Sequence, residues 1–413
     1  MTPNESPTLE AEAASPEIPG TPIRPGTNAA VPPRAPATAN GESVRPYIND
    51  QLNSRLSRDV PEGPIALRWE ANLAPEFPTS FVLASGNRIL TQSTGRWQLF
   101  DPEGKSLGGG KRGAGDLVMD TANGLFYSID PFGVIEAHSL NNAQLEFSVN
   151  ISGGEEWYRA FHARRGNEWV IVSFQQQIQP HAPAEPAAVA IDVQDLGNPP
   201  DIQQHIVVSA KQKSRLYYEL PNVFAALAGD TLVASMRNQI LVTAFGHQVR
   251  ARLTGKFEPG PLSLDETGRI HALVMQPGHA QPALWVLATT GERVFAFEAP
   301  ADVQLRLTPP VIGHNHQVYL TTRDSVMCVS PQGSLLWRRP SQGAVAGIAV
   351  TPNDTVLVAE GATLSVLDAR GERRVLRAFN GDTLITPPAM TAAGEIVVAS
   401  AKRLYVLSNS RAK

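Results

Sequence analysis

The stretch from Leu305 to Pro340 constrains the fold more than any other part of this sequence, because it reads as one complete four-stranded unit. Apolar, partly β-branched runs cover Pro310–Gly313, Gln317–Thr322, Val326–Ser330 and Ser334–Arg338, and short turns containing Gly, Asn, Asp and Ser separate them. Four short strands in about 35 residues predict one up-and-down blade of a β-propeller.

Markers of this unit recur along the chain, which indicates a repeat. The motif Thr308-Pro309-Pro310 returns as Thr386-Pro387-Pro388, which is 78 residues later, or two periods of 39. A turn residue also precedes each outer strand, and neighbouring markers of this kind lie 38 to 45 residues apart where no larger units intervene. These markers are Gly104, Asn142, Gly246, Gly291, Gly333 and Gly371. Two independent markers therefore give the same period.

We predict an all-β fold, a β-propeller of eight four-stranded blades, with seven blades as the alternative count. The units are Phe81–Gly109, Gly115–Asn150, Trp157–Val207, Tyr217–Thr254, Pro261–Glu298, Thr308–Arg338, Val345–Phe379 and Thr386–Asn409. The last unit lacks an outer strand, and Ile65–Leu73 has the composition to supply it, with Trp69 in the place of Trp337. The N-terminal strand would then complete the last blade, close the ring and remove an exposed sheet edge.

The N-terminal region differs in composition from the repeats. Residues 1–46 contain ten prolines and few large apolar side chains, which predicts a disordered Pro-rich tail. Over residues 47–60, Ile48, Leu52 and Leu56 recur every four positions, so we expect a short helix and linker. Residues 61–410 are predicted to form the propeller.

The turn and outer strand of the sixth unit carry a more specific pattern. Gly333 is followed four residues later by Trp337, and Gly291 in the same way by Phe295. In this respect the chain resembles the quinoprotein-like (PQQ-repeat-like) β-propeller family, in which such a Trp docks between neighbouring blades. The resemblance implies an eight-bladed ring and no particular chemistry, since members range from quinone-dependent dehydrogenases to non-catalytic scaffolds.

We place the chain in the non-catalytic branch of that family. The resemblance implies that the enzymatic members hold their quinone between a Trp and, in many cases, a disulfide of adjacent cysteines, with calcium bound by carboxylates and amides. This chain has a single cysteine, Cys328, and no Asp-x-Asp-x-Asp motif. The tryptophans are interpreted as packing between blades, and Cys328 as a small core residue. We therefore expect no catalytic residues, no cofactor and no metal.

Charge and hydropathy exclude further classes. A net charge of -4 and a pI near 6.2 provide no basic surface for nucleic acid. No run approaches the ~18 apolar residues of a membrane span. We expect a protein that is monomeric on its own. It would be cytoplasmic if Met1 is the native start, and periplasmic or secreted if a leader has been removed.

Possible sites of chemistry and binding lie in turns and in irregular loops. His314 and His316 form a His-x-His, interpreted as solvated turn residues because the sequence signals no third ligand nearby. The third and fifth units instead expand the loop between their second and third strands. Loops on a rigid scaffold commonly carry recognition residues. The predicted binding face of blades three to five comprises Trp157, Tyr158, Arg159, His181, Tyr217, Tyr218, Arg237, Asn238 and His279.

The predicted function is that of a non-catalytic protein-binding or scaffold module, acting on a protein partner through this face. Two alternatives from other classes stay open at this point. One is an enzyme, either a quinone-dependent oxidoreductase or a propeller lyase or hydrolase that uses a histidine at the channel mouth. The other is carbohydrate binding by the aromatic loops.

Overall fold

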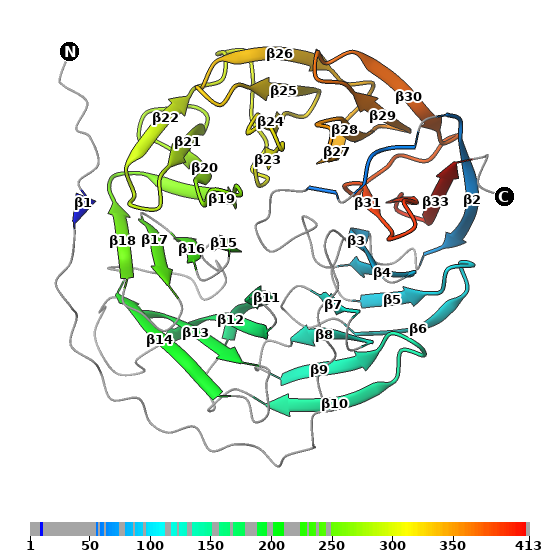
Figure 1. The fold of residues 1–413 in the computed structure, drawn as a ribbon, viewed down its shortest axis with the longest axis horizontal. Helices are drawn as coiled ribbons and strands as arrows, with labels where there is room; N and C mark the ends of the chain where they lie inside the picture. Colours follow the sequence, from blue (N-terminus) through cyan, green and yellow to red (C-terminus); the bar gives the residue numbers. More distant parts are fainter. Residues whose placement is uncertain are drawn as a thin grey trace.

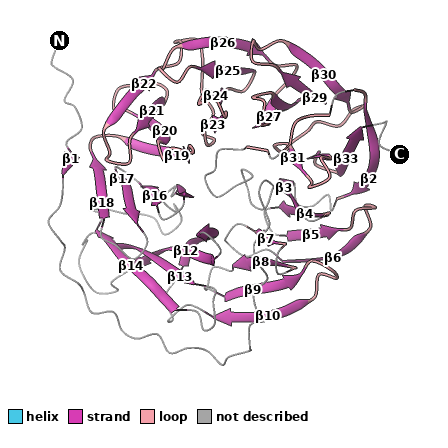
Figure 2. Ribbon diagram, in the orientation of Figure 1, coloured by secondary structure: helices cyan, strands magenta, loops and turns pink. Residues whose placement is uncertain are grey.

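The computed structural model shows a ring of β-sheets around a central axis (Figure 1). It describes residues 9–10, 55–56, 58–61, 63–73, 79–85, 87–93, 96–111, 117–121, 124–129, 134–150, 157–165, 168–177, 188–195, 201–209, 224–228, 231–236, 239–244 and 249–409. For some strands, among them all those between residues 157 and 209, this description covers the backbone alone. These ranges hold no helix, and so none long and apolar enough to cross a membrane (Figure 2).

The described strands form eight sheets, in which consecutive antiparallel strands succeed one another from the axis outward (Figure 1). Blade 1 is β3 (Thr79–Ser85), β4 (Arg88–Ser93), β5 (Arg96–Phe100) and β6 (Ser106–Lys111), and blade 2 is β7 (Val118–Asp120), β8 (Leu125–Ile129), β9 (Val134–Ser139) and β10 (Leu145–Asn150). Blade 3 is β11 (Trp157–Arg165), β12 (Glu168–Gln177), β13 (Ala188–Asp195) and β14 (Asp201–Ser209), and blade 4 is β15 (Phe224–Ala228), β16 (Thr231–Met236), β17 (Gln239–Ala244) and β18 (Val249–Thr254).

The second half of the ring repeats this arrangement. Blade 5 is β19 (Glu258–Leu264), β20 (Ile270–Met275), β21 (Ala283–Leu287) and β22 (Arg293–Phe297), and blade 6 is β23 (Val311–Ile312), β24 (Val318–Thr321), β25 (Ser325–Val329) and β26 (Leu335–Pro340). Blade 7 is β27 (Val345–Val350), β28 (Val356–Glu360), β29 (Thr363–Leu367) and β30 (Arg373–Ala378), and blade 8 is β31 (Ala389–Met390), β32 (Ile396–Ala399), β33 (Arg403–Asn409) and β2 (Ile65–Asn72). The predicted all-β propeller is confirmed.

The sixth blade follows the strand pattern expected from Leu305–Pro340, with every strand boundary within two residues of its predicted position. Its turn Pro331-Gln332-Gly333 needs a left-handed residue, and Gly333 supplies it with a φ of 87°. All five residues of β25 are buried, because each blade is covered by a neighbour on both faces. This explains why its central strands are nearly continuous apolar runs.

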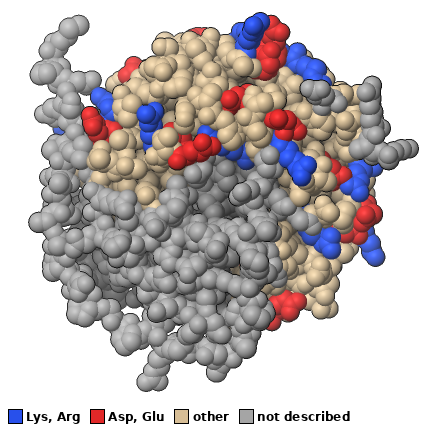
Figure 3. Space-filling model, viewed as in Figure 1, with Lys and Arg blue, Asp and Glu red and all other residues tan. Residues whose placement is uncertain are grey.

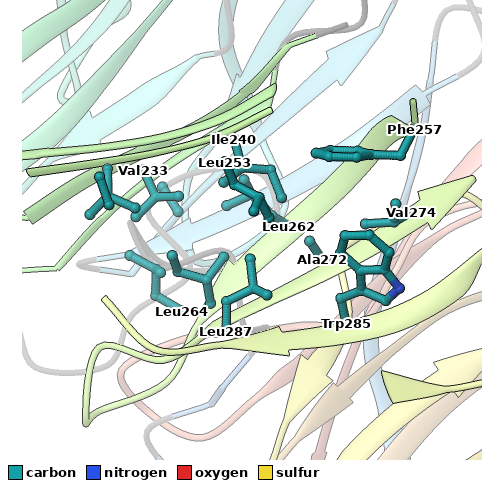
Figure 4. Packing of buried hydrophobic residues seen from close by; sticks show 14 of the residues in the cluster. Val233, Ile240, Leu253, Phe257, Leu262, Leu264, Ala272, Val274, Trp285 and Leu287 are labelled. Carbon is teal, nitrogen blue, oxygen red and sulfur yellow. The ribbon is translucent and has the colours of Figure 1, made fainter. Parts of the chain in front are cut away.

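The core consists of apolar clusters between adjacent blades. Figure 4 shows one of them, in which Val233 and Ile240 of blade 4 pack toward Leu262, Leu264 and Trp285 of blade 5. A further cluster joins blades 1 and 2 around the buried Trp97. These two tryptophans pack between blades, as expected. Cys328 is fully buried in β25, and burial raises the pKa of its thiol to about 12, so it is a core residue.

Aromatic side chains of outer strands dock on glycines of the next blade. The indole of Trp337 covers Gly371, where an added Cβ would lie 2.9 Å from the ring, and its Nε1 donates to the carbonyl of Ala369 at 3.0 Å. Phe295 covers Gly333 in the same way. The glycine of each repeat therefore contacts the aromatic side chain of the preceding blade. It does not contact the aromatic residue that follows it by four positions in its own blade.

The N-terminal strand lies in the last blade, where β2 pairs antiparallel with β33 as the outer strand (Figure 1). Its Trp69 covers Gly104 of blade 1, at 2.6 Å from the position of an added Cβ, and donates to the carbonyl of Pro102 at 2.7 Å. This is the geometry of Trp337 in blade 6. Blades 8 and 1, the two ends of the described ring, thus contact each other as blades 6 and 7 do, by a tryptophan docked on a glycine of the next blade.

The segment just before β2 is described from Arg55 onward, so the expected helix and linker over residues 47–60 stays a prediction. Residues 47–54 lie outside the described residues, and Arg55 forms a parallel bridge with Val350. The amide of Leu56 donates to the carbonyl of Val350 at 2.7 Å. In the predicted tail, β1 (Leu9–Glu10) pairs with β18, and the rest lies outside the described residues.

Candidate functional site

The antiparallel order of the strands gives the ring two distinct faces. Turns between the second and third strands of a blade, and the segments between blades, lie on one face, which we call the connection face. In blade 5 and the approach to blade 6 it comprises Gln276–Pro282 and Glu298–Pro310. The opposite face carries the turns between first and second strands, such as Asp265–Arg269 and Gly313–Gln317.

Four of the nine predicted binding residues lie within the described part. Trp157, Tyr158 and Arg159 are the first three residues of β11, so they begin the inner strand of blade 3 rather than preceding it. His279 lies in the Gln276–Pro282 turn, where 44% of its side chain is exposed and its Nε2 is 4.0 Å from Glu298. All four belong to the connection face. The remaining five, His181, Tyr217, Tyr218, Arg237 and Asn238, lie outside the described residues.

A cavity opens near the axis, lined mainly by connection-face segments that precede and begin blades 6, 7 and 8, together with Phe81 of blade 1. Its volume is about 200 Å³. Most of its lining residues are apolar, among them Leu305, Val311, Ile348 and Ile385, and polar atoms are exposed between them. Arg306 is its one charged lining residue, and the described lining has no carboxylate.

The two Thr-Pro-Pro motifs shape the wall of this cavity. Leu305 and Leu384 form isolated bridges with the ends of the second strands in blades 6 and 8, just before each motif. Proline is tolerated at the positions that follow, because they lie at the inner edge of a blade, where no further strand needs a backbone N–H donor. Pro387 packs on Gly347 of blade 7, where an added Cβ would lie 2.7 Å from its ring. The repeat that identified the fold thus also forms the cavity.

One residue breaks the equivalence of the two motifs. Two residues, Arg306 and Leu307, lie between Leu305 and Thr308, whereas one residue lies between Leu384 and Thr386. We treat Leu307 as the inserted residue. The amide of Thr308 donates to the carbonyl of Arg306 at 2.9 Å, which makes a tight turn around Leu307. Leu307 is 59% exposed, the largest value among the exposed large apolar residues of the described chain.

Arg306 is held in place beside the cavity. Its guanidinium donates to the carbonyl of Val345 at the start of β27 and so links blade 6 to blade 7. A cation at the wall and an exposed leucine next to it in the chain give the cavity mouth both polar and apolar character. On the face that Figure 3 shows, acidic and basic side chains of the described residues are intermixed, and neither sign forms a continuous patch.

The opposite face brings histidines and carboxylates together. His314 and His316 lie half-exposed in the turn of blade 6, 3.3 Å from Glu266 and 3.6 Å from Asp265, respectively. The carboxylates come from blade 5, so no local sequence signal marks them. The buried His271 lies 3.3 Å from Asp265 as well. Within the described residues, no group of three such side chains is arranged to hold a metal ion.

Burial and hydrogen bonding shift the pKa values of two members of this cluster, His271 and Asp265. Complete burial lowers the pKa of His271 below its usual 6.5, although Asp265 opposes the shift. Burial would raise the pKa of Asp265, but hydrogen bonds from His271, Thr267 and the amide of Arg269 outweigh it, and the pKa falls well below 3.8. At neutral pH we therefore take the carboxylate as ionised and the imidazole as neutral.

Acid is expected to destabilise the protein through His271. Because its folded-state pKa lies below 6.5, the unfolded chain binds the proton first, and stability is lost as the pH falls below that value. The slope is at most about 1.4 kcal/mol per pH unit for this one group. Denaturant unfolding from about pH 7 to about pH 5 should show this fall, and His271→Gln should reduce it. An unchanged slope in the variant would contradict the assignment.

Comparisons with known proteins agree on the architecture. No protein-family model matches the sequence, and no curated protein does. Among solved structures, BamB from Moraxella catarrhalis is similar with a TM-score of 0.53 and 12% identity, covering 83% of this chain and 99% of its own. A europium-containing methanol dehydrogenase has a TM-score of 0.58 and 10% identity, covering 89% and 98%. The computationally designed Ika8 protein has 0.56 and 14%, covering 86% and 98%.

These likenesses establish the fold alone. The neighbours share a propeller with this chain, yet they are a dehydrogenase, a designed protein and BamB, so the architecture is compatible with different functions. The cavity does not fit a quinone with a bound cation. Its described lining includes no tryptophan and no carboxylate, and the single Cys328 lies in β25, so a disulfide of adjacent cysteines cannot form.

Proposed function

We propose that this chain is a non-catalytic propeller that binds a protein partner on its connection face, with an apolar side chain of the partner seated in the central cavity. The observation that carries this proposal is the apolar cavity beside the exposed Leu307. Protein interfaces draw most of their affinity from a few anchor residues that fill such pockets. Trp157, Tyr158, Arg159 and His279, on the same face, would contribute to the rim.

The size of the cavity supports a side-chain anchor over a bound small molecule. Pockets for cofactors and drug-sized ligands typically measure about 300–1,000 Å³, and this cavity measures about 200 Å³. A single aliphatic or aromatic side chain needs less space. Leu307 would extend the apolar contact outside the cavity, because most of its side chain is exposed to solvent in the free protein.

Leu307→Asp is expected to weaken partner binding about 30-fold or more while leaving the fold intact. A charge at the centre of an apolar contact must lose water without gaining a partner, and loss of an anchor contact costs about 2 kcal/mol or more, roughly 30-fold in affinity. Purification of the tagged full-length protein from its host, with quantitative mass spectrometry, measures the recovery of each bound protein. Thermal unfolding should be unchanged because Leu307 is exposed.

The matched control is Leu145→Asp, on the outer strand β10 of blade 2, where the side chain is 54% exposed. The partner should be recovered with this variant as with the wild type. Equal recovery with Leu307→Asp would refute the cavity as the anchor. Replacing Trp157, Tyr217 and Arg237 together with alanine tests the predicted face of blades three to five, and unchanged recovery would remove those residues from the interface.

A further inference from the structure

The opposite face holds a second feature, which does not depend on the proposed function. We call the described residues Arg55, Leu56, Arg58 and Asp59 the N-terminal strap. They lie over the inner turns of blades 5 to 7 before the chain reaches β2. Figure 1 shows this segment inside the ring, next to the inner strands β27 and β31.

Arg55 occupies a receptor made of acceptors from two blades. Its Nε donates to the carbonyl of Ile312 at 2.8 Å, a second nitrogen donates to the carbonyl of Gly313, and a third pairs with Glu266 of blade 5. The side chain is only 7% exposed. A planar guanidinium with several donors suits such a set of carbonyls and carboxylate better than any other side chain.

Leu56 and Asp59 extend the contact across blade 7. Leu56 is 2% exposed and packs with Ala349, Leu357 and Met390, in the cluster between blades 7 and 8. Its amide donates to the carbonyl of Val350, and Asp59 accepts from the amide of Asn353 at 3.0 Å. This face thus offers hydrogen-bond acceptors for the guanidinium of Arg55 and an apolar cluster for Leu56. The carbonyl of Val350 accepts from the backbone between them.

The turns that contact the strap are complete without it. The amide of Gly313 donates to Gln317 at 2.9 Å, and the amides of Thr351 and Asp354 are bonded within their own turn. Between backbones, the strap bonds to the described ring through the isolated bridge at Val350 rather than through a ladder. Its removal would therefore leave every described sheet intact, and local opening should require less free energy than global unfolding.

We propose that these turns form a peptide-binding site for a segment with arginine followed by an aliphatic residue, and that the strap fills it in cis. A partner carrying the same pair of residues would displace the strap. Because the strap is tethered, its effective concentration is high, so a free peptide competes poorly with it. Releasing the strap by mutation should therefore reveal the site.

The test uses the full-length double variant Arg55→Ala, Leu56→Ala and a fluorescent peptide of residues 51–61. In fluorescence anisotropy, the peptide is expected to bind this variant at least tenfold more tightly than it binds the wild type. The same peptide with alanine in place of its Arg55 should bind neither protein. The matched control is Arg58→Ala, which changes an exposed arginine of the same strap and should behave as the wild type.

Failure of the peptide to bind the double variant, when that variant keeps the wild-type circular dichroism and melting temperature, would overturn the proposal. A second measurement does not depend on the variant folding. Hydrogen exchange of the wild type should show amides of the strap exchanging at least tenfold faster than the ladder amides of β27. Equal rates would mean that the strap opens only with global unfolding, and the proposed displacement would be wrong. Leu307→Asp, on the connection face, should leave peptide binding unchanged.

Discussion

Trp337→Ala is expected to lower the free energy of unfolding by about 3–5 kcal/mol, the usual cost of deleting a buried aromatic side chain. Trp337 is 7% exposed, covers Gly371 of the next blade and lies 6.0 Å from the ring of Tyr319. The truncation leaves a cavity between blades 6 and 7, and it also leaves the carbonyl of Ala369 without its indole donor. Denaturant unfolding at equilibrium measures the change.

The control is the neighbouring residue of the same strand. Leu336 is 48% exposed, so Leu336→Ala should change stability by no more than about 0.5 kcal/mol. If both variants lost the same amount, the effect would come from the strand itself and not from docking between blades.

Trp69→Ala is expected to cost about 2–3 kcal/mol, somewhat less than Trp337→Ala because Trp69 is only half-buried. Its indole covers Gly104, lies 6.5 Å from Phe100 and donates to the carbonyl of Pro102. Because it joins blades 8 and 1, hydrogen exchange should accelerate in β2 and β33 before other strands.

Glu70→Ala provides the comparison, one residue along β2. Glu70 pairs with Arg403 at 3.2 Å, but both side chains are more than 40% exposed, and such pairs contribute less than about 1 kcal/mol. Uniform acceleration of exchange in all blades of the Trp69→Ala protein would show that the contact between blades 8 and 1 has no special role in opening the ring.

Much of the fold follows from local pattern. The strands of blade 6 were predictable to within two residues, because apolar runs and Gly turns act over a few neighbouring positions. Contacts between distant segments lie beyond the reach of this reasoning, as the chain near Leu56 shows. Its four-residue apolar spacing has a helical period, but at Arg55 and Leu56 the backbone bonds to Val350, nearly 300 residues away. No local period indicates such a partner.

The candidate sites were harder to predict. Leu307 carried a signal, since it is an insertion when the two Thr-Pro-Pro repeats are compared, yet only the structure shows its exposure beside a cavity. Arg55 carried none, because its acceptors lie 211 to 258 residues away in sequence. Of the residues predicted for the binding face, His279 and the start of β11 lie on the connection face, and their role in binding stays a prediction.

The sequence by itself determined the architecture, because a repeated strand pattern with docking aromatics and glycine turns has a propeller as its compact solution. The tertiary structure alone decided where the cavity opens, which glycine receives each aromatic side chain, and that Arg55 and Leu56 lie over the inner turns. The physical reason is the distance in sequence between the residues that interact. Strands and turns depend on residues a few positions apart, whereas a cavity or a guanidinium receptor depends on segments that become neighbours only once the ring has formed.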